Sequence, residues 1–254
     1  MIPLAQAVRP VPALALTLLA LTLLMPVARA APDADALVAA ADAIRFPTEA
    51  FQIQVKVTTS GRSAQDVHEY QVLQKGHDQS VVRTLSPAAE KGQVMLLKGA
   101  DLWVFMPQVS QPVRLPLSQR LTGQVANGDL ARANFAGDYK ATLLAEEDIG
   151  GKRCAKLELT AARRGVTYQR VLYWVELATK RPVKVEFYTV SKRLMKSGVY
   201  QDFKDMGGVV RPARLVLTDE LRKGEKSVLE YTGLKKRDIP DKVFSKEFLR
   251  KLQN

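Results

Sequence analysis

The sequence predicts a mainly β protein, built as an antiparallel meander with one apolar face. Three observations support this fold class. Apolar and polar residues alternate with a period of two in one segment after another between Phe51 and Tyr231. The connections between these segments are short, whereas a parallel crossover needs about a dozen residues or more. Helical periodicity is clear only near the two ends of the chain.

The first thirty residues have the features of an export signal. The unbroken apolar run Val11–Leu24 is followed by Ala28-Arg29-Ala30, the small-x-small pattern that a signal peptidase cuts. The run is about fourteen residues long, shorter than the roughly twenty that span a bilayer. We expect residues 1–30 to be a cleaved signal peptide and residues 31–254 to form a single β domain. No cysteine stands at the cleavage point, so no lipid anchor is expected there.

A helix is predicted at the start of the expected domain, over Asp33–Ile44. Asp33 or Asp35 can cap its first turn, and Pro47 prevents its continuation. Its apolar face would comprise Leu37, Ala40, Ala41 and Ile44.

Strands follow this helix, separated by glycine and proline residues. Those predicted before the middle of the chain are 51–57, Val67–Gln74, Ser80–Leu85, Gln93–Lys98, Asp101–Met106 and Val113–Leu115. Those predicted after it carry the apolar sets Tyr139, Ala141, Leu143; Ala155, Leu157, Leu159; Val171, Tyr173, Val175; Val183, Val185, Phe187; Ala213, Leu215, Leu217; and Leu229, Tyr231. The sheet would therefore contain about eleven to thirteen strands. A C-terminal helix is predicted over Asp241–Leu252, with Val243, Phe244, Phe248 and Leu252 placed to pack.

The segment Ser118–Tyr139 interrupts the meander with polar residues and glycines. Gly128-Asp129 can cap a short helix over Leu130–Phe135, and Leu121 with Val125 fits another helical turn. Because apolar residues are sparse here, the segment would be held weakly over a hydrophobic opening and could be displaced. A solvated loop is the alternative. The candidate cover residues are Leu121, Val125, Leu130 and Phe135.

No catalytic or metal-binding constellation is found in the sequence. His68 and His77 are expected to be solvated surface residues. Neighbouring strand residues point to opposite faces, so Glu146 and Glu147 cannot flank one glycosidic bond. Cys154, the only cysteine, is expected to be an inert thiol, and no disulfide can form within the chain. We expect no enzyme activity, catalytic residue, cofactor or metal, and a hydrolase is the least favoured function.

The apolar face of the sheet is the informative feature, because it must be buried against something. A second sheet, a helix, closure of the sheet on itself or a ligand would each bury it. A closed and fully packed barrel without a ligand is therefore an alternative to a binding protein. The candidate lipid-binding wall comprises Ile53, Val55, Val57, Tyr139, Leu143, Leu157, Leu159, Val171, Tyr173, Val185, Phe187, Leu215, Leu217, Leu229 and Tyr231.

Charge also limits the expected partners. The whole chain has a formal net charge of +12, which favours lipid head groups or acidic protein surfaces. Nucleic acid is not expected as a partner, because the chain is expected to be exported. Arg114, Arg120 and Arg132 lie near the cover segment and could contact lipid phosphate or an acidic partner.

A series of short motifs spans nearly all of the expected mature chain. In order they are Leu85-Ser86-Pro87, Lys91-Gly92, Leu102-Trp103, Met106-Pro107, Arg114-Leu115, Ser118, Gly123, Asp129-Leu130, Asp138-Tyr139, Glu147, Gly150-Gly151, Tyr173-Trp174-Val175, Pro182, Glu186-Phe187-Tyr188, Arg211-Pro212, Ile239-Pro240 and Phe244. With these motifs the chain resembles the LolA-like outer-membrane lipoprotein-sorting proteins, in particular a branch associated with exporters of the resistance–nodulation–division class.

The resemblance implies an unclosed, strongly curved antiparallel sheet, a half β-barrel, with terminal helices and a short helical cover over its concave face. It also implies a periplasmic location. We therefore predict a monomeric, non-enzymatic carrier, with a hollow that its own side chains fill incompletely. Its partners would be a lipid or acylated protein cargo, an inner-membrane exporter and an outer-membrane receptor. The alternative is an accessory subunit of such an exporter that binds protein without carrying cargo.

Overall fold

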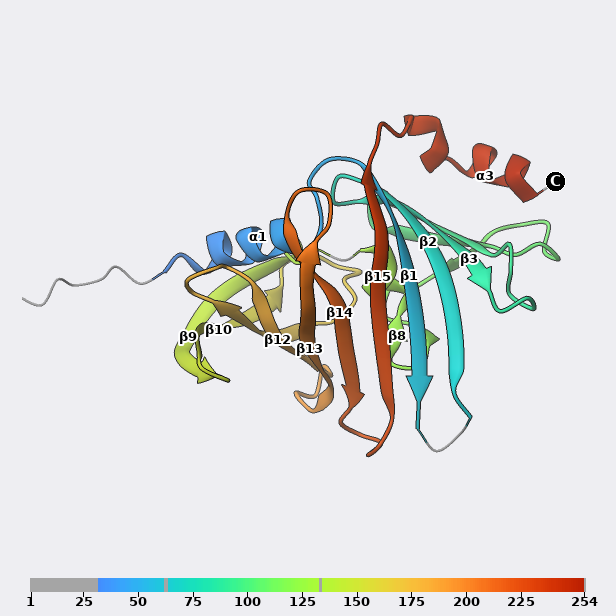
Figure 1. Cartoon of the computed structure of the whole chain (residues 1–254). Helices are drawn as coiled ribbons and strands as arrows, with labels where there is room; N and C mark the ends of the chain where they lie inside the picture. Colours follow the sequence, from blue (N-terminus) through green and yellow to red (C-terminus); the bar gives the residue numbers. More distant parts are fainter. Residues whose placement is uncertain (1–31, 62–63, 133, 254) are drawn as a thin grey trace, which may run out of the picture. The chain divides into compact units, whose positions relative to one another are not determined.

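Thirteen strands form one antiparallel sheet, which is curved so that one of its two faces is concave (Figure 1). In their order across the sheet they are β6 (Val113–Leu115), β5 (Asp101–Phe105), β4 (Val94–Lys98), β3 (Gln79–Ser86), β2 (Asp66–Lys75), β1 (Phe51–Ser60), β15 (Lys226–Lys236), β14 (Val210–Asp219), β13 (Leu194–Asp205), β12 (Pro182–Tyr188), β11 (Arg170–Glu176), β10 (Lys152–Ala161) and β9 (Tyr139–Ile149). β6 and β9 are the two edges and do not pair with each other, so the sheet is not closed. The predicted fold class is confirmed.

The computed structural model describes residues 32–61, 64–132 and 134–253. The chain divides into two units, Met1–Ala31 and Pro32–Asn254, and the first lies outside the described residues together with the predicted signal peptide. Within the described part, no helix has the length and apolar character needed to cross a membrane.

Four helical segments and a small hairpin accompany the sheet. They are α1 (Ala34–Arg45), the hairpin of β7 (Arg120–Thr122) and β8 (Val125–Ala126), α2 (Asn127–Ala131), the 3-10 helix η1 (Asp241–Phe244) and α3 (Lys246–Gln253). Asp33 caps α1, as predicted, by accepting the backbone N–H groups of Asp35 and Ala36 at 3.0 and 3.3 Å. Among residues 32–61, 64–132 and 134–253, helix thus occurs only near the two ends and beside the hairpin.

The buried face of α1 differs from the prediction. Besides Leu37 and Ala41, which were predicted, it contains Val38, Asp42 and Arg45. Ala40 and Ile44 are only partly buried. The face is rotated because Asp42 and Arg45 form an ion pair of 3.1 Å inside the protein, so their charges do not require solvent.

The two faces of the sheet bury different clusters, as the period of two requires. The concave face carries the large core, which includes α1 and residues of the hairpin and α2. The opposite face of β3, β4 and β5 carries a smaller cluster formed with the C-terminal helices. The fold therefore has one main interior and a separate outer layer.

The predicted C-terminal helix is interrupted, and it does not cover the concave face. It is broken at Ser245 into η1 and α3, where Phe244 and Leu249 are buried against Val81 and Leu96 of the outer face. Figure 1 likewise shows α3 beyond the upper end of β15. The expectation that both terminal helices cover the hollow holds for α1 alone.

Two strand details also differ from the prediction. No strand was predicted at 194–205, yet β13 lies in the sheet between β12 and β14. Val183 does not share a face with Val185: the register shifts where Trp174 pairs with Lys184 and Val175 with Pro182. This bulge turns Val183 toward the outer cluster of Cys154, Leu172 and Trp174.

Candidate functional site

The predicted wall residues lie together on the concave face. All fifteen belong to one apolar cluster, fourteen as buried members and Leu143 as a partly buried neighbour. They come from strands across the sheet because each strand directs alternate side chains inward. Whether they contact a ligand stays a prediction.

The concave face contains more tyrosine than the prediction recognised. Six of the seven tyrosines of the chain lie in this cluster. Tyr70, Tyr168 and Tyr200 were not predicted there; Tyr200 is on the unpredicted strand β13, and Tyr168 lies in the connection before β11. The buried hydroxyls of Tyr70 and Tyr173 have no hydrogen-bond partner among the described residues. The wall is therefore apolar in its bulk but carries polar hydroxyl groups.

The segment 118–139, hereafter the cover, packs its apolar side chains into this cluster. Val125, Leu130 and Phe135 are buried and Leu121 is partly buried. The local structure differs from the prediction: Leu121 and Val125 belong to the β7–β8 hairpin, not to a helical turn, and the short helix begins at Asn127. The carboxylate of Asp129 accepts the N–H of Ala126 at 2.8 Å, which caps the helix from within its first turn.

The space between wall and cover is filled by side chains. A cavity of about 30 Å³ lies beside Arg45, Phe135 and Tyr200 in this interior, and another of about 10 Å³ lies beside Leu130. Cavities of this size hold about one water molecule each, whereas ligand pockets usually enclose roughly 300–1,000 Å³. The expectation of an incompletely filled hollow is wrong for this conformation, because the cover and the tyrosines occupy it.

A buried charge pair connects α1 to the cover. The carboxylate of Asp42 accepts the backbone N–H groups of Phe135 and Ala136, both at 2.7 Å, and pairs with Arg45. The Arg45 guanidinium also lies 4.8 Å from the ring centre of Phe135. Hydrogen bonds to a charged group contribute about 1.5–3 kcal/mol each. One end of the cover is thus fixed by polar contacts.

A second buried network holds the other part of the cover. Lys196 of β13 donates to Asp129 at 2.7 Å and to the carbonyl oxygen of Gln124 at 2.5 Å. The hydroxyl of Tyr168 donates to the same carboxylate at 2.9 Å. Burial lowers the pKa of Lys196, while its neighbour Asp129 opposes that shift. The ammonium group is therefore held by the carboxylate of the cover.

Further bonds tie the cover to the strands beneath it. Ser80 donates to the carbonyl oxygen of Ala131 at 2.7 Å, and Ser227 accepts the N–H of Gln124 at 2.9 Å. His77 lies 3.0 Å from the Asn134 amide. With these contacts and the two charged networks, the expectation of a weakly held cover is wrong: sparse apolar contact is supplemented by buried polar bonds.

His68 is buried, contrary to the prediction of a solvated residue, and His77 is exposed as predicted. The Nδ1 atom of His68 lies 3.2 Å from the Thr122 hydroxyl of β7, and its ring stacks on Tyr70. Glu90 lies on the other side, 3.4 Å from Nε2. The sequence pattern did not place the cover over β2. It therefore predicted a solvated His68, whereas the cover buries this side chain.

The three predicted basic contacts have different environments. Arg132 is buried, pairs with Asp138 and donates to the Gly99 carbonyl oxygen at 2.8 Å, so it is not available as a head-group contact. Arg114 is exposed and pairs with Asp101. Arg120 is exposed and lines a surface pocket of about 240 Å³. Arg120 is the member of this set that remains free to contact an anion.

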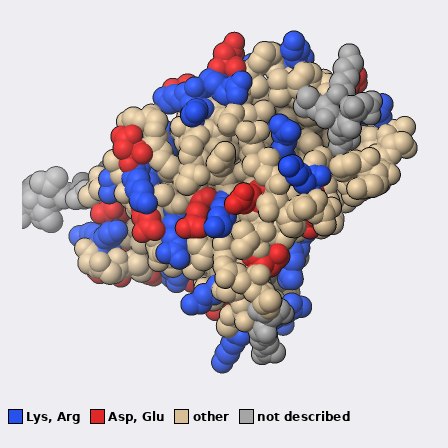
Figure 2. All heavy atoms as spheres, turned by 45° about the vertical axis from the view of Figure 1, so that its right-hand side comes forward, with Lys and Arg blue, Asp and Glu red and all other residues tan. Residues whose placement is uncertain are grey.

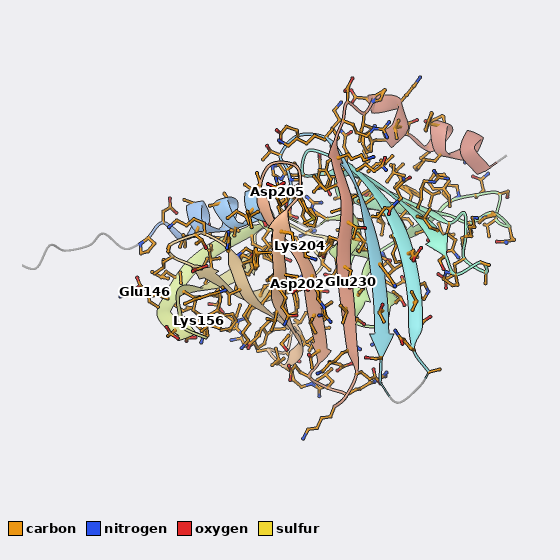
Figure 3. All side chains as sticks on the ribbon, in the orientation of Figure 1. Glu146, Lys156, Asp202, Lys204, Asp205 and Glu230 are labelled. Atoms are coloured by element: carbon orange, nitrogen blue, oxygen red, sulfur yellow. The ribbon has the colours of Figure 1, made fainter. Side chains whose placement is uncertain are left out.

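Glu146, Glu147 and Cys154, the candidates for chemistry in the sequence, have structural partners or are buried. Glu146, labelled in Figure 3, pairs with Arg153, and Glu147 pairs with Lys156 at 2.8 Å. Cys154 is a free, buried thiol whose pKa is raised mainly by burial. No group of three or more potential metal ligands occurs among the described residues.

Comparison with known proteins gives the family. Residues 76–251 match a family model with the description "-like: Uncharacterized protein". A LolA superfamily protein from Nitrosomonas europaea is 52% identical; the match covers 86% of this chain and 100% of that one, with a TM-score of 0.82. No curated protein matches the chain.

Two more distant structures share the fold. A DUF1329 family protein from Desulfovibrio piger is 19% identical, over 85% of this chain and 97% of that one, with a TM-score of 0.74. A domain described as an outer membrane lipoprotein-sorting protein, from Vibrio parahaemolyticus, is 18% identical, over 85% of this chain and 98% of that one, with a TM-score of 0.73. The identity and coverage of the Nitrosomonas match decide the classification: the chain belongs to the LolA superfamily.

Proposed function

We propose that the protein is a non-enzymatic carrier that holds the acyl chains of a lipid or lipoprotein between the wall and the cover. Membership in the LolA superfamily supports this proposal. One observation carries it: the cover is a separate small unit of hairpin and helix whose apolar side chains occupy the concave face. A guest chain could take the same place if the cover moved away.

The energetics of this exchange are compatible with reversible binding. An acyl chain gains about 0.8 kcal/mol per buried methylene group. A sixteen-carbon chain would gain roughly 12 kcal/mol as an upper figure. The contacts of Val125, Leu130 and Phe135, together with the hydrogen bonds that Asp42 accepts from the cover and that Lys196 donates to Asp129, oppose opening. Most of the gain would thus be offset, so that cargo is held and can still be released.

The predicted signal peptide and the family resemblance support a periplasmic location. The cargo would then be an acylated or lipidic molecule that passes between an inner-membrane exporter and an outer-membrane receptor.

A reversible covalent lock of the cover tests the proposal. A Cβ atom built on Gly128 of α2 would lie 3.0 Å from the Cβ of Thr167, close to the roughly 3.5–4.5 Å found across disulfides. We expect the oxidised double variant Gly128→Cys, Thr167→Cys to bind no fluorescent sixteen-carbon acyl probe. Reduction of the same sample should restore binding, because it frees the cover.

Each single cysteine variant is the matched control, since it carries the same local change without the bond. The native Cys154 is buried and on the outer face, so it should not compete for the new thiols. Undiminished probe binding by fully cross-linked protein would show that cargo does not enter beneath the cover, and the proposal would be abandoned.

A further inference from the structure

Two neighbouring turns at one end of the sheet expose apolar side chains. Residues 189–193 connect β12 to β13, and residues 220–225 connect β14 to β15; together we call them the paired turns. Val190 is 84% exposed and Leu221 is 46% exposed. The turns are adjacent because β13 pairs with β14, with Lys196 opposite Asp219. Each turn therefore presents one apolar residue to solvent on the same side of the protein.

Basic residues surround these two apolar side chains. Lys192 and Arg193 follow Val190, and Arg222 and Lys223 follow Leu221; all four are exposed and form no ion pair within the described part of the chain. The two turns with the adjoining Lys226 contain five basic and two acidic residues, a net charge of +3. In Figure 2, Lys and Arg side chains project from the lower end of the protein, the end at which these strands turn in Figure 1.

The backbone of both turns is organised by local hydrogen bonds. In the first turn the Thr189 hydroxyl accepts the N–H of Arg193 at 3.0 Å. In the second, the buried carboxylate of Asp219 accepts the N–H groups of Leu221 and Arg222, both at 2.7 Å. The N–H of Glu220 donates to the carbonyl oxygen of Met195 at 2.9 Å, which joins the second turn to β13. The exposed side chains are thus presented by ordered turns.

The pocket of about 240 Å³ opens at the base of the paired turns. Met195, Asp219 and Leu221 line it from the turn side, and Arg120 with Val125 lines it from the cover. A surface that held the paired turns would therefore face the boundary between the cover and the sheet.

We propose that the paired turns dock the protein on an anionic phospholipid bilayer. Basic residues are attracted to the negative surface potential of such a membrane, and an adjacent apolar side chain can enter the interface between head groups and acyl chains. The combination of two projecting apolar residues with four unpaired cations fits a lipid surface better than an acidic protein surface, which would leave Val190 without an apolar partner. The docking surface goes beyond the proposed function, because it identifies the side of the protein at which cargo would be exchanged with a membrane.

Binding to vesicles tests this docking surface. We expect the wild-type protein to co-sediment with vesicles of phosphatidylcholine containing phosphatidylglycerol, and not with phosphatidylcholine alone. The double variant Lys192→Glu, Arg222→Glu should bind the anionic vesicles at least about tenfold more weakly, because four units of charge change at the surface. When Trp103 and Trp174 are both replaced by Phe, a Val190→Trp variant should show a blue shift of its emission on addition of anionic vesicles, since the new side chain enters the interface.

The matched control is Lys204→Glu, Lys235→Glu, which changes the net charge equally. Both residues are exposed, and Figure 3 shows Lys204 toward the upper end of β13, away from the paired turns. We expect its vesicle binding to stay within about twofold of wild type. An equal loss in both double variants, or no binding by the wild-type protein, overturns the docking surface. An acidic protein as the true partner would appear as the second of these outcomes.

The acyl-probe assay in solution keeps the two proposals separate. Both double variants should take up the probe like the wild type, because the substitutions lie outside the wall and the cover. Failure of the wild type to take up probe would count against the carrier and not against membrane docking.

Discussion

Asp42 joins α1 to the cover through one buried carboxylate. Its carboxylate balances the buried Arg45 and accepts two backbone N–H groups of the cover. Removing one member of a buried ion pair costs about 3–5 kcal/mol, because the other charge stays buried without compensation. We therefore expect Asp42→Ala to lower the free energy of unfolding by about this amount, as measured by urea denaturation.

The double variant Asp42→Ala, Arg45→Met separates two contributions to the loss of stability. One is the uncompensated charge of Arg45, and the other is the loss of the hydrogen bonds that Asp42 accepts. It leaves no uncompensated charge, so we expect it to be more stable than Asp42→Ala alone. A double variant less stable than the single one would contradict this account of the pair.

Asp35 should make the stability of the fold depend on pH in a defined direction. The hydrogen bond from the Lys140 side chain, and then that from the Ala141 N–H, hold the pKa of this carboxyl below its ordinary value of 3.8. A pKa that is lower in the folded than in the unfolded protein stabilises the fold above the ordinary value, and this stabilisation is lost as the pH falls below it.

We therefore expect the difference in unfolding midpoint between wild type and Asp35→Asn to be constant from about pH 7 to about pH 5 and to shrink below about pH 4. Thermal unfolding followed by circular dichroism measures it. A difference that grows on acidification would mean that Asp35 acts in some other way.

Residues on the concave strands were predictable because alternation assigns each side chain to a face. Leu157 and Leu159, for example, were predicted on the face where they are fully buried. Asp42, Arg45 and Lys196 were not, because a sequence pattern assigns charged residues to the wet face. Lys196 pairs with the distant Asp129, and Asp42 bonds the distant Phe135, contacts that only the folded chain brings together. The i, i+3 spacing of Asp42 and Arg45 beside Val38 and Ala41 was the available signal.

At the scale of elements, the hairpin of the cover is held by a close approach at Gly123. This residue has a φ of +49°, and a Cβ atom there would lie 2.1 Å from the Thr59 hydroxyl oxygen and 2.4 Å from that of Ser227. Ala at this position must therefore push the hairpin away from β1 and β15. We expect Gly123→Ala to speed up amide hydrogen exchange in 118–132, measured by mass spectrometry.

Gly150→Ala is a suitable control for this substitution. Gly150 has a φ of +60°, so its replacement carries a similar backbone penalty, but a Cβ atom there meets nothing within 4 Å. We expect normal exchange of the cover in this variant. Equal acceleration in both would indicate a general loss of stability and not a local displacement.

Long alternating strands were predictable as elements, whereas short or irregular ones were not. β13 escaped prediction because Gly198 interrupts its inward face. That glycine is required by crowding: a Cβ atom would lie 2.7 Å from the Val185 side chain and 3.1 Å from that of Leu217. The β7 and β8 strands are too short to show a period, and helical periodicity at the C-terminus does not reveal which face of the sheet the helix covers.

At the scale of the whole described unit, one apolar core extends beneath both halves of the sheet. Trp103 lies on β5 near one edge and Trp174 on β11 near the other. Because the core is continuous, we expect Trp103→Phe and Trp174→Phe, each with one remaining fluorophore, to report the same shape of unfolding transition by fluorescence and by circular dichroism. Separate fluorescence and dichroism midpoints within either variant would indicate two independently unfolding halves.

The unclosed sheet could not be predicted from alternation, which is equally compatible with a closed barrel. Strand number and a single apolar face do not determine whether the first and last strands of a sheet meet. The expectation of an open sheet came from the resemblance to a family, and the pairing order confirmed it.

The free edges β6 and β9 determine how the interior can enlarge. A closed barrel could widen only if one complete ladder of backbone hydrogen bonds between two strands were broken. Here β6 and β9 do not pair with each other, so moving these two edge strands apart breaks no hydrogen bonds between neighbouring strands. The proposed binding of a guest would therefore require only bending of the sheet and rearrangement of side chains, both of which are reversible.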